Sequence, residues 1–433
     1  MIKEKLRLVL AILSLLTVFL FWWSVALGSY LYFGVPMNME PFIVDYSTGE
    51  PVLREVESPH PYPINWTDRL VLKVPYAELR IEKLVLESGD ILVVENLATG
   101  DRWFWAGNGT GLLTKTFYAG SSGLLELAIA ILDDGDGRTS WGLVIRTYVT
   151  DIWPLRVRPY LLIVILPVAL PAIPAWALAA FIQAFSIALL LASWAGSGGF
   201  HHKVACGWRE PFLKSFGNPL FALPFISTAT LTGTVALTWL LEAVGIGAGM
   251  AGGLPGPLTT LMEASYAALV EELGFRLMLI GIPLALAACV KTRGGRPRAE
   301  IILKALLWPG ALDEELRRSL KTAMAGLVLF SSVVFGLAHV LFGAWEVGKA
   351  ITATLAGLVM ALCFVKYGLH ASMLVHWFFN YHIQVWPVAY QLLGPPYDLL
   401  DALVTLYELG LGALSLLLFF IQGIRMAMRR ART

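Results

Sequence analysis

Charged residues are scarce in this chain. Asp, Glu, Lys and Arg make up 15% of its 433 residues, whereas hydrophobic residues make up 57%. A soluble globular domain usually carries about 25% charged and 45–50% apolar residues, so one large soluble domain is excluded. The formal net charge is only +1, and this balance does not favour a nucleic acid as a partner.

Cysteine is rare as well, and its three positions, Cys206, Cys289 and Cys363, are isolated from one another. Without CxxC spacing, neither a disulfide framework nor a thiolate metal site is indicated. The chain also lacks an HExxH sequence. Any zinc site would therefore have to be assembled from separate helices.

The first third of the chain combines an apolar run with a soluble-looking segment. The run from Leu8 to about Phe33 is long enough to span a bilayer, which predicts a retained signal anchor. Lys3, Lys5 and Arg7 precede it and place the N-terminus in the cytoplasm. Residues 34–158 then alternate apolar and polar residues between turn signals, at 69–75, 79–87, 90–95 and 140–150. This pattern predicts an extracytoplasmic, β-sandwich-like domain.

The remaining two thirds of the chain is mostly apolar. Its apolar runs lie at about 160–195, 218–245, 256–290, 323–343, 347–366, 369–390 and 403–424. The first run exceeds one straight span of about 20 residues. Pro167, Pro171 and Pro174 within it could kink one helix or separate two short ones.

Basic residues decide between these alternatives. Lys and Arg are concentrated at 291–321 and at the C-terminus, so both segments should be cytoplasmic. Treating 160–195 as one kinked span places both there. We therefore predict an all-α polytopic cell-membrane protein of about eight transmembrane helices, with both termini cytoplasmic and the β-rich domain inserted outside. Its predicted parts are an anchor (1–33), the β-rich domain (34–158), a kinked helix with a cytoplasmic loop (159–217), a membrane core (218–390) and a last helix with a basic tail (391–433).

Three charged residues, Glu271, Glu272 and Arg276, stand inside one apolar run. Each charge at bilayer depth costs at least about 2.5–3.5 kcal/mol, so the three need partners or a function. Glu272 and Arg276 are i, i+4 neighbours and can form an ion pair. Glu271 lies about 100° round the helix and is free to face a cavity. A purely structural ion network between helices is the alternative.

Four of the seven histidines fall in the last apolar segments: His339, His370, His376 and His382. His339 ends the sequence Phe335-Gly-Leu-Ala-His339, whose small residues permit close helix approach. His376 and Asn380 are i, i+4 and share a helix face. His370 and His382 lie about 120° from His376, which predicts core or interfacial positions for them.

These side chains could perform hydrolysis. A carboxylate and a histidine can polarise a water molecule and accept its proton. An imidazole and a carboxamide can hold the oxyanion of a tetrahedral intermediate. Glu271, His339 and His376 could equally ligate zinc, whose bound water would then be the nucleophile. A site without a cofactor and a zinc site are therefore both open at this point.

Three motifs resemble, in order and spacing, the signature of the CAAX-protease and bacteriocin-processing family, which includes the Ras-converting CAAX endopeptidases and the Abi proteins. They are Glu271-Glu272-x-x-x-Arg276, Phe335-x-x-x-His339 and His376-x-x-x-Asn380. The resemblance covers about 218–390. It implies an intramembrane protease acting on a membrane protein or a lipidated peptide within the lipid bilayer.

The resemblance also implies a role for each motif residue. Glu271 and His339 would activate the water, and His376 and Asn380 would form the oxyanion site. Glu272, Arg276 and Phe335 would support these groups. The anchor and the β-rich domain lie outside the resemblance.

A non-enzymatic membrane protein is the rival class of function. A scaffold, a transporter or a receptor with an external ligand-binding domain would have similar composition. Transporters often show paired inverted repeats, and no convincing pair is evident here. The complete set of motif residues favours the protease.

The predicted orientation can be tested by cysteine labelling of intact cells. With residues 34–158 outside, Ser122→Cys should react with a membrane-impermeant maleimide before lysis. Labelling of Ser122→Cys only after lysis would reverse the orientation.

Overall fold

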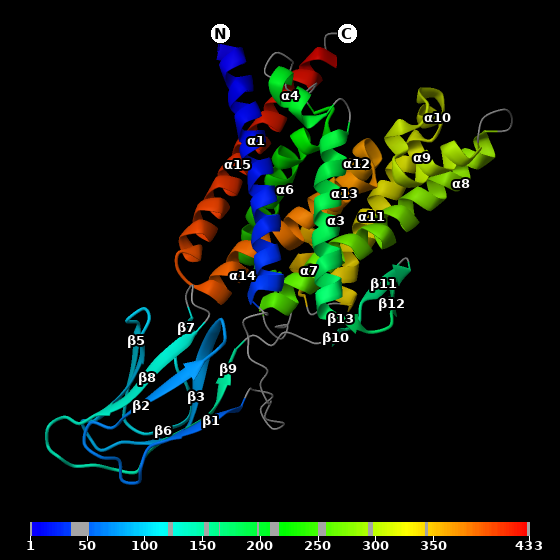
Figure 1. Ribbon diagram of the computed structural model, residues 1–433. Helices are drawn as coiled ribbons and strands as arrows, with labels where there is room; N and C mark the ends of the chain where they lie inside the picture. Colours follow the sequence, from blue (N-terminus) through cyan, green and yellow to red (C-terminus); the bar gives the residue numbers. More distant parts are fainter. Residues whose placement is uncertain are drawn as a thin grey trace.

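The structure, a computed structural model, is a helical bundle with a β-rich unit at one end (Figure 1). Both chain termini lie at the opposite end of the bundle. The structure describes residues 2–35, 52–119, 124–150, 156–163, 165–196, 199–207, 216–249, 257–292, 298–342 and 345–430. Position 122, chosen above for labelling, lies outside these ranges.

Seven helices in the described ranges are long and apolar enough to cross a membrane, so the chain is a polytopic membrane protein. The first is α1 (Ile2–Ser29), which continues into the π-helical η1 (Tyr30–Gly34). The others are α3 (Ala175–Ala195), α6 (Pro219–Ala243), the continuous α7 (Pro257–Glu272), η3 (Leu273–Gly281) and α8 (Ile282–Lys291), then α11 (Lys321–Phe342), α12 (Val347–Tyr367) and α15 (Tyr397–Arg430).

The eighth predicted span, at 369–390, is helical but is not among these seven. It consists of α13 (Leu369–Trp377), the π-helical η5 (Phe378–His382) and α14 (Ile383–Leu393). Its histidines, Asn380 and glutamines make it less apolar than the others. Trp377, Phe378 and Tyr381 are fully buried, so this helix lies inside the bundle, surrounded by the other helices.

The β-rich unit contains two antiparallel sheets. One has the strand order β1-β9-β3-β6, with β7 paired to β3, and the other has the order β2-β8-β4-β5. The strands are β1 (Val52–Glu57), β2 (Thr67–Leu72), β3 (Tyr76–Val85), β4 (Ile91–Asn96), β5 (Arg102–Ala106), β6 (Gly109–Leu113), β7 (Phe117–Tyr118), β8 (Leu125–Leu132) and β9 (Gly142–Val149). Alternate residues of these strands share one buried core, as in Leu125, Leu127 and Ile129. An inserted β-rich domain is therefore present.

The prediction of one kinked helix over 160–195 is wrong in its first half. Tyr160–Ile163 (β11) and Leu166–Ala169 (β12) form an antiparallel hairpin, and β10 (Arg156–Val157) pairs with β13 (Ile173–Pro174). The three prolines of this stretch lack the N–H that a helix interior needs, and β-branched Ile and Val favour strands. Only α3 crosses here, so one span remains in this run.

Short helical segments lie between the long helices: α4 (Phe200–Gly207), α9 (Arg298–Leu307), the 3-10 turn η4 (Pro309–Ala311) and α10 (Glu314–Ser319). Glu314 and Arg318 of α10 form an ion pair, and both side chains are largely exposed. This acid–base cluster therefore belongs to a surface helix.

A buried polar pair joins the first and last helices to η5. Nε2 of His382 lies 2.6 Å from Oε1 of Glu408 in α15, and Nδ1 lies 2.9 Å from Oγ of Ser24 in α1. All three side chains are buried. His382 is therefore a core residue, as its helix face predicts.

Helices α11 and α12 cross closely at Gly336, three residues before His339. A Cβ atom at position 336 would lie 2.3 Å from the carbonyl oxygen of Ala350 and 2.0 Å from Oγ1 of Thr354. A backbone atom cannot give way as a flexible side chain can. Glycine at this position therefore sets the distance between the two helices.

We expect Gly336→Ala to destabilise the protein by about 1–3 kcal/mol, the usual effect of overpacking. Gly326→Ala is the matched control in the same helix, since no atom lies within 4 Å of its added Cβ. It should be neutral or stabilising, by at most about 1 kcal/mol, because alanine favours helix. Thermal unfolding in detergent measures both. Equal melting temperatures for the two variants would contradict the close-approach argument.

Candidate active site

The motif residues come from three helical segments, and two of them contain π-helical stretches. Glu271 and Glu272 end α7, directly before η3, and Asn380 lies within η5. His339 lies near the end of α11. π-Helical stretches are rare and frequently occur at functional sites.

Glu272 is fully buried and has three polar partners. Its Oε2 lies 3.4 Å from Nε of Arg276 and accepts a hydrogen bond from Oγ of Ser372. Its Oε1 lies 3.0 Å from Nδ1 of His376. The predicted ion pair with Arg276 is therefore present, and the contact with His376 adds an orienting role that the helix geometry did not reveal.

Arg276 connects this carboxylate to α11. Its Nη1 donates to Oγ of Ser331 at 3.2 Å, and that hydroxyl donates to the carbonyl oxygen of Phe275. The guanidinium carbon lies 4.8 Å from the ring centroid of Phe335, within the range of a cation–π contact. Arg276 is fully buried, so its charge depends on these neighbours and on Glu272.

Phe335 packs between the two motif histidines. Its ring centroid lies 4.7 Å from that of His339 and 5.7 Å from that of His376, in edge-on arrangements. Its carbonyl oxygen lies 2.9 Å from Nδ1 of His339. A carbonyl only accepts, so Nδ1 of His339 is the donor and Nε2 remains for another partner.

Glu271 lies on the other side of His376. Its Oε2 is 3.7 Å from Nε2 of His376, and its side chain is partly exposed. This oxygen is buried and has no hydrogen-bond partner within the described ranges. His376 thus lies between two carboxylates, with Nδ1 facing Glu272 and Nε2 facing Glu271.

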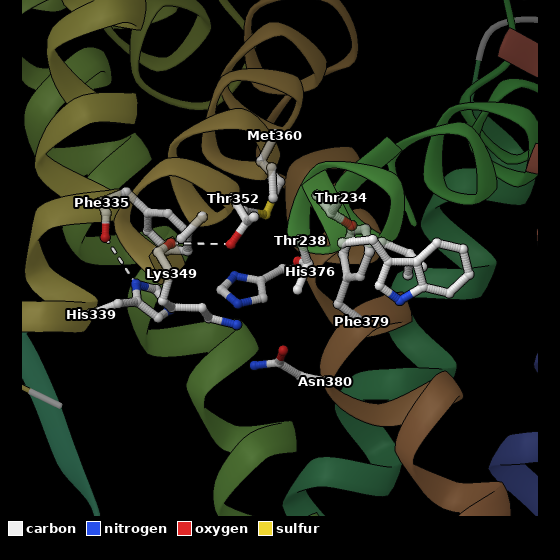
Figure 2. A pocket seen from close by; sticks show the side chains of 14 residues that line it. Thr234, Thr238, Phe335, His339, Lys349, Thr352, Met360, His376, Phe379 and Asn380 are labelled. Carbon is white, nitrogen blue, oxygen red and sulfur yellow. Dashed lines mark hydrogen bonds between the residues drawn. The ribbon is translucent and has the colours of Figure 1, made fainter. Parts of the chain in front are cut away.

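A cavity of about 320 Å³ adjoins the two motif histidines, and Glu271 is not among its lining residues. Figure 2 shows His339, His376 and Asn380 around it, together with the amine of Lys349. Nδ2 of Asn380 donates to the carbonyl oxygen of Ala264 at 3.0 Å, which uses one of its two N–H groups. The wall also includes Thr234, Thr238, Trp239, Thr352, Met360 and Phe379. The cavity therefore combines apolar walls with a few polar groups, as ligand sites usually do.

The predicted zinc ligands offer one carboxylate and two imidazoles. Both histidines engage Nδ1 and leave Nε2 available, as metal-binding histidines do. Among the described residues, two sets of three side chains bring their possible metal-ligating atoms within 4.8 Å of one another. Both sets lie in the β-rich unit: Glu87, Asp134 and Asp136, and Asp90, Asp133 and Asp134. Glu271, His339 and His376 are not such a group. The donor atoms are of the types that zinc binds, so a zinc site here stays a prediction.

Comparison with known proteins identifies part of the chain. Residues 254–382 match the family model described as Type II CAAX prenyl endopeptidase Rce1-like, and this range contains all three motifs. These residues form an Rce1-like domain of the CAAX-protease family. No curated protein and no solved structure matches the chain significantly. The Rce1-like domain excludes α1, the β-rich unit and α15.

The sequence patterns did not single out two polar residues of this site, Ser372 and Lys349. Ser372 lies four residues before His376, so its place on the same helix face could have been predicted. Lys349 is a charged residue two positions into an apolar helix, a type of residue that is functional by default in membranes. Its role could not be derived from spacing, because no motif includes it.

The two adjacent glutamates should respond differently to neutralisation. Glu272→Gln leaves the buried Arg276 cation uncompensated, which typically costs about 3–5 kcal/mol. Glu271→Gln removes no ion-pair partner of Arg276 and should leave stability near that of the wild type. Thermal unfolding in detergent separates the two variants.

A double variant serves as the control. Glu272→Gln with Arg276→Met should regain part of the stability that Glu272→Gln loses, because no unpaired charge remains. If Glu271→Gln is instead the destabilised protein, the roles of the two carboxylates are reversed.

Proposed function

We propose that this protein is an intramembrane endopeptidase that hydrolyses peptide bonds of membrane-associated proteins. The observation that carries the proposal is the Glu271 carboxylate, whose buried Oε2 lacks a hydrogen-bond partner in the described ranges and lies 3.7 Å from His376. A buried polar atom without a partner is costly and calls for a function. The Rce1-like domain supports a protease as the reaction class.

In the proposed reaction, a water molecule binds between Glu271 and Nε2 of His339. Glu271 accepts a proton from the water as the resulting hydroxide attacks the substrate carbonyl carbon. The carboxylic acid then returns this proton to the departing amide nitrogen. Positioned acid–base catalysis of this kind contributes roughly 10²–10⁴ in rate.

The oxyanion of the tetrahedral intermediate would be held by His376 and Asn380. The second N–H of the Asn380 amide remains available after its bond to Ala264. Since Nδ1 of His376 faces Glu272, Nε2 donates only when the ring carries both protons, and the flanking carboxylates would balance that charge. Lys349, whose amine is directed between His376 and Asn380 in Figure 2, would add positive potential at this position.

This mechanism uses no cofactor. Zinc held by Glu271, His339 and His376 is the alternative source of an activated water, and inhibition by a chelator that zinc reverses would favour it over the metal-free mechanism.

The protein is proposed to be oriented with its termini in the cytoplasm and its β-rich unit outside. The Lys and Arg residues at 291–321 and at the C-terminus support this orientation by the positive-inside rule. Membrane-associated proteins or lipidated peptides are the proposed substrates.

Alanine substitutions test the reaction. Glu271→Ala, His339→Ala and His376→Ala should abolish cleavage while the protein still inserts into the membrane. Asn380→Ala should lower the rate by roughly 10²–10³, the usual effect of one lost oxyanion donor. The matched control is His370→Ala, a histidine of the same helix that is not in the cavity wall. Its rate should stay near that of the wild type.

Substrates can be found by profiling cleavage sites in the host membrane proteome with the wild type and Glu271→Ala. Sites that appear only with the wild type identify substrates. Near-wild-type turnover by Glu271→Ala would refute the hydrolytic mechanism, and the absence of any site specific to the wild type would favour a scaffold, receptor or transporter.

A further inference from the structure

Three wall residues of the cavity lie close to one end of their helices. Thr238 is five residues before the end of α6, and His339 is three residues before the end of α11. Lys349 is two residues after the start of α12. At 1.5 Å per residue, these side chains lie within roughly 3–8 Å of the helix ends.

These helix ends are adjacent to one another in the structure. The backbone N–H of Gly348 donates to the carbonyl oxygen of Gly247 at 2.9 Å, which joins the start of α12 to the chain that follows α6. The N–H of Glu346 donates in the same way to Ala248, at 3.2 Å. The cavity walls therefore end at one common face of the bundle.

This face is the one that carries the β-rich unit. α6 begins beside α4 at the terminus end of the bundle, so its last residues point toward the β-rich unit (Figure 1). Tyr118 of that unit stacks on Tyr390 of α14, with ring centroids 6.3 Å apart, and approaches Gly394. The β-rich unit is thus attached at the end of the bundle where the cavity lies.

Near this face a wall residue of the cavity is exposed, whereas buried residues lie on the side of the termini. Trp239 in its wall is 69% exposed. Toward the termini, the same helices are filled by Phe225, Phe364 and Leu374, which are completely buried. A peptide could not reach these positions without separating the helices, because completely buried side chains are close-packed.

We infer that the substrate reaches the cavity from the membrane face that carries the β-rich unit. With the termini in the cytoplasm, the bonds cut would lie in extracytoplasmic segments of membrane-associated proteins, not in cytoplasmic tails. This substrate class rests on the proposed protease function and on the proposed orientation. The position of the opening depends on neither.

Single cysteines introduced into the variant Cys206→Ser, Cys289→Ser, Cys363→Ser test the opening. Thr238→Cys reports on the cavity, Ala106→Cys on the exposed end of β5 and Met428→Cys on the terminus end. A membrane-impermeant maleimide is applied to intact cells and to inside-out vesicles. We expect Thr238→Cys to be labelled in the preparation that labels Ala106→Cys. It should stay unlabelled in the preparation that labels Met428→Cys.

Labelling of Thr238→Cys only in the preparation that labels Met428→Cys would overturn the inference. Failure of Thr238→Cys to react in either preparation, with full reaction after denaturation, would also overturn it, because a closed cavity admits no segment. A second measurement uses one substrate segment fused on either side of a membrane anchor. Cleavage only on the side of the β-rich unit is expected, and cleavage only on the other side would overturn the inference. Cleavage on neither side, with labelling as expected, would refute the protease function and leave the opening established.

Discussion

The burial of one carboxylate organises the centre of this bundle. Glu272 has no exposed surface, and an isolated carboxylate in such surroundings would be strongly destabilising. It is retained because Arg276, His376 and Ser372 surround it on separate sides. These partners belong to η3 and α13, and Arg276 extends the connection to α11 through Ser331. The contacts of Glu272 and of its partner Arg276 therefore connect the helices that carry the three motifs.

The same carboxylate links stability to the chemistry of the cavity. By occupying Nδ1 of His376, Glu272 directs Nε2 toward Glu271. The π-helical turns on both sides of the site complete this arrangement, since Glu271 and Glu272 precede η3 and Asn380 lies within η5. Two adjacent glutamates consequently have different surroundings, one saturated with partners and one with a free oxygen. Environments that differ in this way allow identical side chains to have different roles.

Much of this arrangement could be predicted from the sequence, and the exceptions have physical reasons. The i, i+4 spacing predicted the Glu272–Arg276 pair, because that contact depends only on the helix period. The contact of Glu272 with His376 joins residues 104 positions apart, and no local pattern encodes it. Apolar runs located the outer helices. They wrongly predicted a helix at 160–169, because a run of apolar residues is compatible with a strand as well as with a helix. Whether the site holds zinc depends on how separate helices pack, which cannot be derived from the order of the motifs.

The buried pair of His382 and Glu408 has a consequence for the synthesis of the protein. Ser24 lies in α1, which is synthesised before the Rce1-like domain, and Glu408 lies in α15, which is synthesised after it. His382 lies two residues after Asn380, in the same π-helical segment. Until α15 is inserted, His382 lacks the carboxylate that compensates its burial, and η5 lacks one of its anchors. A nascent chain that already contains the whole Rce1-like domain is thus still incomplete at its centre. Assembly of this segment therefore requires α1 and α15, which lie on opposite sides of the Rce1-like domain in the sequence.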